Sequence, residues 1–200
     1  MSNTQFTPSI TSRPVYPGLT SLGNVPAIMI ADASGQEALK ELAAADSSVM
    51  DQAHVLLVTT SPALADKLQD LRPASIETVS DLDAAVPSFE RLLSTAKMGT
   101  QLYLAGAEGL IGFFSARALG SGLPQEAIQS EHRGPISRRM QCVHCKGVTE
   151  DVTTDPFTCS HCGLTLFVRD HFSRRLGVFQ GVCVDAEVPG EVPETEEIQP

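Results

Sequence analysis

The sequence contains no tryptophan, and aromatic residues make up only 5% of its 200 residues. Hydrophobic residues still amount to 42%, so we expect a core formed mainly by aliphatic side chains. No apolar run approaches the length that crosses a bilayer, and residues 1–14 lack the charged start and apolar stretch of a signal peptide. We therefore expect a cytoplasmic protein without a membrane contact.

Positive charge is also scarce, since 14 Lys and Arg residues stand against 24 Asp and Glu residues. The distribution is uneven: residues 132–182 carry seven basic and four acidic side chains, whereas residues 183–200 carry six acidic side chains and no basic one. An acidic domain and an acidic tail repel a polyanion, and nucleic-acid-binding proteins usually present a net basic surface. We therefore expect no nucleic-acid partner, and we interpret the basic segment as a surface for an acidic protein.

Four of the five cysteines form two C-x-x-C pairs that are separated by thirteen residues. The four are Cys142, Cys145, Cys159 and Cys162. Each pair directs two thiolates from one tight turn toward the same ion, and two pairs complete the tetrahedron that zinc adopts in structural sites. Gly147 and Gly163 follow the pairs, where a sharp turn favours a residue that tolerates positive φ. Because cysteine fills all four positions, the pattern predicts a structural zinc without an open position for substrate.

Other uses of these cysteines are less well supported. A rubredoxin-like iron centre has the same four-thiolate tetrahedron, but its cysteine pairs usually lie further apart. Two disulfides require an oxidising compartment, and nothing in the sequence indicates export. His144 and His161 lie inside the pairs, and with four thiolates available we interpret them as exposed loop residues. The fifth cysteine, Cys183, is interpreted as a small, partly buried apolar residue.

Upstream of the cysteines, short apolar runs alternate with segments of helical periodicity. Strands are expected at residues 27–31, 54–59, 76–79 and 101–105, and helices at 36–45, 64–71 and 110–119. One more helix is expected around Phe89, with Pro87 in its first turn. Strands that alternate with helices predict a doubly wound, mostly parallel sheet with helices on both faces.

These patterns divide the chain into four parts. Residues 1–25, which are rich in Ser, Thr, Pro and Gly, form an N-terminal arm, and residues 26–135 form the α/β domain. Residues 136–184 form a small zinc ribbon with the basic segment that follows it, and residues 185–200 form an acidic tail. The predicted fold class is therefore α/β, followed by a zinc ribbon.

The end of the α/β domain resembles the closing unit of ferredoxin-reductase-type nicotinamide-binding domains. The similarity covers residues 102–110, the helix that follows, the turn Gly122-Leu123-Pro124 and residues 128–131. Ala105 and Ala107 replace the Cys and Pro of that family's Cys-Gly-Pro motif, and Gln129 replaces a His. The resemblance implies a degenerate domain of this type.

The loop after the first predicted strand departs further from that family. The family has a phosphate loop rich in Gly and Thr, whereas residues 31–35 of this chain read Ala-Asp-Ala-Ser-Gly. A carboxylate at Asp32 repels a phosphate group at the position where the phosphate would accept hydrogen bonds from backbone N–H groups. We expect that the fold is retained and that dinucleotide binding is lost.

The C-terminal third carries a second, more specific resemblance. The two cysteine pairs, together with residues 166–182, which read LFVRDHFSRRLGVFQGV, are similar to the DmmA-like subunit family of bacterial dimethylamine monooxygenase. Residues 12–16, which read Ser-Arg-Pro-Val-Tyr, also look like the N-terminal arm of that family. The resemblance implies a multisubunit, haem-dependent oxidative N-demethylase that uses NADPH and O₂ to convert dimethylamine to methylamine and formaldehyde. Haem, flavin and iron–sulfur centres are then expected on companion subunits, within a hetero-oligomer.

The chain itself shows no set of residues that could carry this chemistry, so we expect no catalytic and no cofactor-binding residue apart from the metal ligands. We expect a solvated or interface turn that binds a partner, and its residues are Arg169, Asp170, His171, Arg174 and Arg175. Two other functions remain open. One is electron transfer, through iron in the four-cysteine site or through a flavin or nicotinamide on the α/β domain. The other is a stand-alone zinc-ribbon binding protein.

Overall fold

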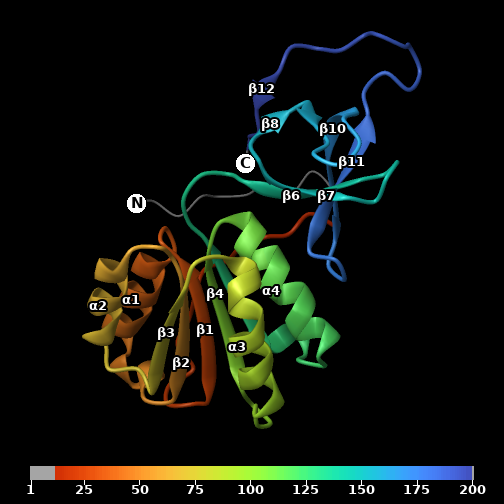
Figure 1. Cartoon of the computed structure of the whole chain (residues 1–200). Coiled ribbons are helices and arrows are strands. Elements are labelled where there is room, and N and C mark those ends of the chain that lie inside the picture. The colour runs from red at the N-terminus through yellow and green to blue at the C-terminus, as the bar shows by residue number, and fades with distance from the viewer. Residues whose placement is uncertain (1–11, 200) are drawn as a thin grey trace.

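The computed structural model describes residues 12–199 and contains two main β-sheets (Figure 1). The first sheet is parallel throughout, with the strand order β3-β2-β1-β4-β5. Its strands are β1 (Ala27–Asp32), β2 (Ala53–Val58), β3 (Ser75–Val79), β4 (Gln101–Gly106) and β5 (Ile128–His132). Strands β2 and β3 are added on one side of β1, and β4 and β5 on the other, so the strand order reverses between β1 and β4. The carboxyl ends of these two strands frame the crevice where open α/β sheets usually bind ligands.

Helices cover both faces of this sheet. They are α1 (Gln36–Ala45), α2 (Pro62–Gln69), α3 (Leu82–Ser94) and α4 (Glu108–Gly120), with short 3₁₀ turns at Ser47–Met50 and Gln125–Ala127. α1 and α2 pack on the face that carries Met29 and Ala31, whereas α3 and α4 pack on the face that carries Ile28 and Ile30. The predicted doubly wound parallel sheet is therefore confirmed. No helix within residues 12–199 combines the length and the apolar character that a membrane span requires.

Helix α3 begins earlier than the sequence suggests. The Asp81 carboxylate accepts a hydrogen bond from the Ala84 N–H at 2.8 Å and caps the helix at Leu82. Pro87 consequently lies inside the helix instead of in its first turn, so that prediction is wrong. The buried side chain of Phe89 joins α3 to α4 through an edge-to-face contact with Phe114, at 5.1 Å between ring centroids.

The second sheet is mixed and has the strand order β7-β6-β11-β10-β9. Its strands are β6 (Arg138–Cys142), β7 (Val148–Val152), β9 (Phe157–Thr158), β10 (Thr165–Ser173) and β11 (Val178–Cys183). β6 and β11 run parallel, and the other pairs are antiparallel. A separate antiparallel pair joins β8 (Thr154–Asp155) to β12 (Glu196–Glu197). The core of this part is small, and Met140, Leu166 and Cys142 are its most buried members among the described residues.

The N-terminal arm lies along the outer edge of β5. The Gly18 N–H donates to the Ser130 carbonyl at 3.3 Å, and the Leu19 N–H donates to a Glu131 carboxylate oxygen at 2.9 Å. The arm therefore covers a sheet edge that would otherwise offer unpaired backbone groups. Residues 1–11 of the predicted arm lie outside the described residues.

The second sheet packs directly on the α/β domain through α4. A Cβ atom on Gly177, in the turn between β10 and β11, would lie 2.1 Å from the Gly112 carbonyl oxygen of α4. A Cβ on Gly112 would lie 2.8 Å from the Gly177 carbonyl oxygen. The two backbones meet so closely that only glycine fits at either position, and this contact sets how the β10–β11 hairpin lies against the helix.

Candidate functional site

The four cysteines of the two C-x-x-C pairs come together at the tips of two hairpins. Cys142 and Cys145 lie at the turn between β6 and β7, and Cys159 and Cys162 lie at the turn between β9 and β10. All four Sγ atoms lie within 4.8 Å of one another. The structure thus brings the four predicted ligands into one cluster.

The distances between sulfur atoms match a four-thiolate metal site. A tetrahedral ion with metal–sulfur bonds of about 2.3 Å places its ligands roughly 3.8 Å apart. The distance from the Cys142 Sγ to the Cys162 Sγ is 3.9 Å, and from the Cys145 Sγ to the Cys159 Sγ it is 3.7 Å. These spacings suit zinc, and they suit a rubredoxin-like iron equally, because both ions take this geometry with four thiolates. Four protein ligands complete such a coordination sphere.

The two metal-binding turns have the same backbone hydrogen bonds. In the first, the Cys142 N–H donates to the Gly147 carbonyl and the Lys146 N–H donates to the Cys142 carbonyl, both at 3.0 Å. In the second, the Cys159 N–H donates to the Leu164 carbonyl at 2.9 Å, and the Gly163 N–H donates to the Cys159 carbonyl at 3.0 Å. Each turn therefore closes in the same way and presents its two sulfurs to one point.

One part of the glycine prediction is wrong. In the two cysteine turns, the residues with positive φ are Lys146, at 62°, and Gly163, at 75°. The left-handed position of the first turn is therefore taken by Lys146 and not by Gly147. Gly147 is required for another reason, because a Cβ there would lie 2.5 Å from the His161 ring. The His161 Nε2 lies 2.9 Å from the Val148 carbonyl oxygen. This histidine therefore packs between the two turns instead of acting as a ligand.

Backbone N–H groups also point at the sulfurs. The Gly147 N–H donates to the Cys145 Sγ at 3.4 Å. Burial raises the pKa of the Cys159 thiol, but N–H groups of Cys162 and His161 outweigh it, together with the neighbouring thiols, and lower this pKa to about 6. Donors of this kind favour the thiolate, which is the form that binds a metal ion.

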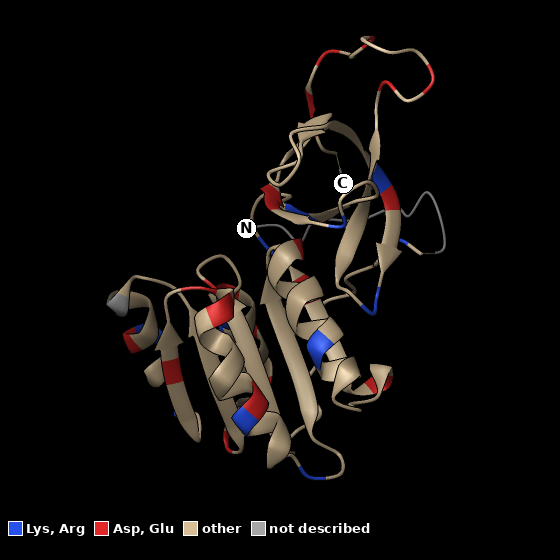
Figure 2. Ribbon diagram, turned by 45° about the vertical axis from the view of Figure 1, so that its right-hand side comes forward, with Lys and Arg blue, Asp and Glu red and all other residues tan. Residues whose placement is uncertain are grey.

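The predicted partner-binding residues do not all lie on the surface. Residues 169–171 belong to β10 and not to a turn, and the register of β10 against β11 shifts between Arg169 and Phe172. Asp170 lies on the opposite face of β10 from its exposed neighbours Arg169 and His171, and its carboxylate is partly buried. Arg169, His171, Arg174 and Arg175 are exposed, and the last two lie in the turn between β10 and β11 (Figure 2).

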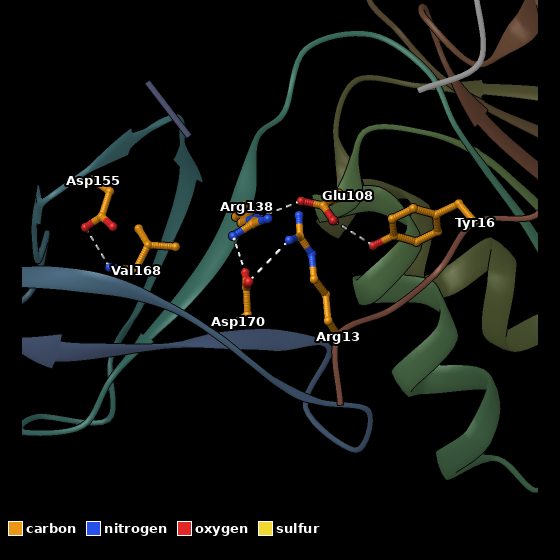
Figure 3. A network of polar contacts seen from close by, with 7 residues as sticks. All are labelled: Arg13, Tyr16, Glu108, Arg138, Asp155, Val168 and Asp170. Carbon is orange, nitrogen blue, oxygen red and sulfur yellow. Dashed lines mark hydrogen bonds and ion pairs between the residues drawn. The ribbon is translucent and has the colours of Figure 1, made fainter. Parts of the chain in front are cut away.

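Asp170 belongs instead to a network of charged side chains at the junction of the two sheets (Figure 3). Its carboxylate accepts hydrogen bonds from Arg138 at 3.1 Å and from Arg13 at 3.2 Å. Arg138, which is only 2% exposed, also donates to the Glu108 carboxylate at 2.9 Å. The Tyr16 hydroxyl donates to the other oxygen of Glu108 at 3.0 Å. The network therefore joins the arm, α4, β6 and β10.

Nothing in the local sequence indicates this network, because its members are separated by up to 157 positions. The guanidinium of Arg138 also lies over the Phe179 ring, at 4.5 Å from the centroid. Arg133 is another basic residue that the structure buries, since it pairs with Glu131 and Glu41. Part of the positive charge of residues 132–182 is therefore used inside the molecule.

The crevice at the carboxyl ends of β1 and β4 contains Asp32. Its carboxylate accepts hydrogen bonds from the N–H groups of Ser34, Gly35 and Ala107, each at 2.8 Å. A Cβ on Gly106 would lie 2.3 Å from an Asp32 carboxylate oxygen, so the loop after β4 closes tightly over this group. Burial raises the pKa of Asp32, and the three N–H donors partly offset this effect. The backbone groups that would bind a phosphate at this crevice thus already bind the protein's own carboxylate.

These features define a class of protein: a doubly wound α/β domain joined by buried ion pairs to a β-sheet part with a four-thiolate cluster. The chain belongs to the DmmA-like family of dimethylamine monooxygenase subunits. Residues 8–128 match the N-terminal domain of the family, and residues 139–182 match its C-terminal domain. The resemblance that the sequence indicated is therefore confirmed.

A curated relative has a name that describes its assembly. The chain is 35% identical over 112 residues to the protein named heme-dependent oxidative N-demethylase delta subunit, from Ectopseudomonas mendocina (strain ymp). The match covers 56% of this chain and 62% of the relative. The relative's name describes one subunit of an oxidative N-demethylase, and the chain is similar to it over somewhat less than two thirds of its length.

Proposed function

We propose that this chain is a non-catalytic subunit of a multicomponent, cytoplasmic dimethylamine monooxygenase. The complex would use NADPH and O₂ to convert dimethylamine to methylamine and formaldehyde, with haem, flavin and iron–sulfur centres on companion subunits. The family match supports the assignment to such a complex. The observation that carries the non-catalytic role is the closed cluster, in which four cysteines supply all the ligands of a tetrahedral ion.

The metal in this proposal is a structural zinc that is held by Cys142, Cys145, Cys159 and Cys162. Among residues 12–199, the hydrophobic core of the second sheet has seven buried members, and two of them are the proposed ligands Cys142 and Cys159. So small a core contributes little stability, whereas zinc bound to four thiolates couples its binding free energy to folding. The ion would therefore hold the two hairpins in a fixed relation.

In this proposal the α/β domain serves for docking and does not bind a dinucleotide. The support comes from Asp32, whose carboxylate accepts hydrogen bonds from three backbone N–H groups at the crevice. A pyrophosphate would have to displace a hydrogen-bonded carboxylate and would be repelled by its charge.

The proposed first docking surface is the basic hairpin, which we define as Arg169, His171, Arg174 and Arg175 on β10 and its turn. A hollow of about 430 Å³ lies beside it, with His171, Phe172, Leu176 and Val178 in its lining. Leu176 is 38% exposed. A hollow with mixed polar and apolar lining beside a basic hairpin suits an acidic surface of a companion subunit that inserts one side chain. Asp170 would support this surface indirectly, because its carboxylate accepts a hydrogen bond from the buried Arg138 and so holds β10 against β6.

The test is a gentle affinity purification of this chain from its native host grown on dimethylamine, with a visible spectrum and metal analysis of each separated subunit. We expect companions that contain haem and flavin, and a chain that is itself colourless and loaded with one zinc. A chain that elutes alone with an iron or flavin spectrum would instead be an electron carrier, and the proposal would be wrong. A chain that elutes alone with zinc would be a stand-alone zinc-ribbon protein.

A further inference from the structure

The C-terminal segment contains a short repeat that neither the fold nor the metal site uses. Glu-Val-Pro occurs at residues 187–189 and again at residues 191–193. Val188 is 50% exposed and Val192 is 52% exposed, so two of the six large hydrophobic residues found exposed among the described residues lie in this one loop. We call residues 186–195 the Glu-Val-Pro loop.

The middle of this loop has a defined conformation. The Glu191 N–H donates to the Val188 carbonyl at 3.2 Å, which closes a four-residue turn with Pro189 and Gly190 at its centre. Gly190 has φ of 89°. Proline followed by a glycine with positive φ is the sequence and geometry of a type II turn. The turn places the two valines on either side of a rigid corner, with a glutamate directly before each.

Both ends of the loop are tied to the part of the chain that holds the four cysteines, the N-terminal end beside β11 and the C-terminal end at β8. On the N-terminal side, the Asp185 carboxylate accepts hydrogen bonds from the Cys183 Sγ at 3.0 Å and from the Gly190 N–H at 3.3 Å. On the C-terminal side, β12 pairs with β8, and the Ile198 N–H donates to the Thr153 carbonyl at 2.9 Å. Ile198 also packs on the hydrophobic core of the second sheet. The segment therefore leaves the sheet and returns to it as a closed loop, which projects away from the α/β domain (Figure 1).

We propose that the Glu-Val-Pro loop is a second docking element of this subunit, and that it binds a companion protein subunit at an apolar groove with a basic rim. The charge of the segment determines this choice, since residues 183–200 contain six acidic residues and no basic one. A partner with Lys or Arg around the groove complements the glutamates, and the groove buries the two valines. Because the loop is held at both ends, it loses less conformational entropy on binding than a free tail does.

A purely solubilising tail does not require these features. Acidic side chains keep a tail solvated by themselves, and half-exposed valines add nothing to that role. Such a tail also has no need of a C-terminal anchor in the core. The repeated valines and the anchored return therefore favour a recognition element.

The loop lies far from the basic hairpin within the same sheet. The tail starts where β11 ends, whereas Arg174 and Arg175 lie in the turn where β11 begins, so the two surfaces are at opposite ends of that strand (Figures 1 and 2). They also have opposite charge. This inference rests on the proposed function and extends it, because a subunit with two such surfaces can bridge two companions of different charge.

The experiment uses the full chain, purified as part of its complex from the host grown on dimethylamine. The double variant Val188→Ser/Val192→Ser removes the apolar anchors, and the triple variant Glu187→Gln/Glu191→Gln/Glu194→Gln removes the charges. The matched control is Leu22→Ser, which changes a side chain that is 52% exposed in the arm. The control for charge is Glu90→Gln/Glu126→Gln, since both glutamates are exposed on the α/β domain. Metal content and circular dichroism of each variant show whether the fold is intact.

We expect the double valine variant to retain its metal and its fold. Its dissociation constant for one companion subunit should rise at least tenfold, as measured by size-exclusion or interferometry titrations. The triple glutamate variant should weaken the same interaction and flatten its salt dependence. Both controls should behave as the wild type does. If the wild type retains its companions and both loop variants retain them equally well, the inference is wrong while the proposed function stands.

Two further results would also overturn the inference. A wild-type chain that elutes without companions removes the proposed function and the loop's role together. Self-association of the isolated chain that the valine variant abolishes would show that the loop binds a second copy, through the basic hairpin of that copy.

Discussion

Replacing Glu108 by Ala tests whether the buried ion pairs hold the two sheets together. The Glu108 side chain is fully buried and accepts hydrogen bonds from Arg138 and from Tyr16. Its loss leaves Arg138, which is 2% exposed, with the partly exposed Asp170 as its remaining carboxylate at hydrogen-bond distance. Removal of one partner from a buried ion pair typically costs about 3–5 kcal/mol, and the remaining contact to Asp170 places our expectation near 3 kcal/mol.

The Tyr16 hydroxyl adds a further cost. It lies in the buried part of the arm, and burial, followed by the charge of Glu108, raises its pKa well above the ordinary value. A buried hydroxyl that loses its acceptor costs on the order of 1–3 kcal/mol. The variant should therefore loosen the arm as well as the contact between α4 and β6.

The assay is urea denaturation of the metal-loaded chain, followed by circular dichroism and by proteolysis of the segment between β5 and β6. We expect a transition at lower urea and earlier cleavage in Glu108→Ala. The control is Glu150→Gln, because the Glu150 side chain is 48% exposed and stays solvated in its pair with Arg139, so its loss should cost only about 1 kcal/mol. A Glu108→Ala variant within 1 kcal/mol of the wild type would refute the reasoning. Glu108→Met/Arg138→Met should recover much of the loss if the charge left alone is the cause.

Four other changes test the metal site and the crevice. Cys145→Ser should unfold the second sheet, release the metal and detach the chain from its companions while the α/β domain stays folded, and retained assembly with full metal content would contradict this. Gly147→Ala should cost about 1–3 kcal/mol, because its Cβ would displace the His161 ring, and the measured rate of metal transfer to a chelator should rise. Asp32→Ala frees three N–H groups, so its melting temperature should rise with phosphate at constant ionic strength, whereas that of the wild type should not. Burial lowers the pKa of His132, so its contribution to stability is present above about pH 6.5 and is lost as the pH falls through the lower folded-state pKa. In His132→Gln, the free energy of unfolding from urea titrations should lose this dependence on pH.

The parallel sheet could be predicted from the sequence because its signals are local. A strand such as β1 is a short run of apolar residues, and α1 has its buried residues at helical spacing, so each element is recognised without knowledge of its neighbours. The four cysteines could be predicted for the same reason, since each pair fixes its own turn. The location of Pro87 could not, because the cap at Asp81 sets the helix start and proline is tolerated further along.

The ion-pair network could not be predicted, because its geometry depends on how two domains pack. Arg138 precedes the first cysteine pair in a basic segment, and its sequence context gives the same signal as the exposed Arg174. What separates them is tertiary packing, because β6 places Arg138 against Glu108 of α4, whereas Arg174 lies in the exposed turn between β10 and β11. Likewise, Asp170 points inward between the two exposed residues Arg169 and His171, as alternation along a strand requires, but the local sequence does not show which face of β10 meets the α/β domain.

Asp32 occupies the crevice of the α/β domain with its own carboxylate. In a sheet of this topology, the N–H groups after β1 and β4 form the ordinary place for an anion. Here a carboxylate from the end of β1 satisfies those groups from within the chain, and Gly106 allows the loop to close on it. The crevice thereby becomes a rigid corner of the domain, and this corner positions the start of α4, where Glu108 meets Arg138. The carboxylate that accepts hydrogen bonds from these N–H groups therefore also supports the junction on which the four-cysteine sheet rests.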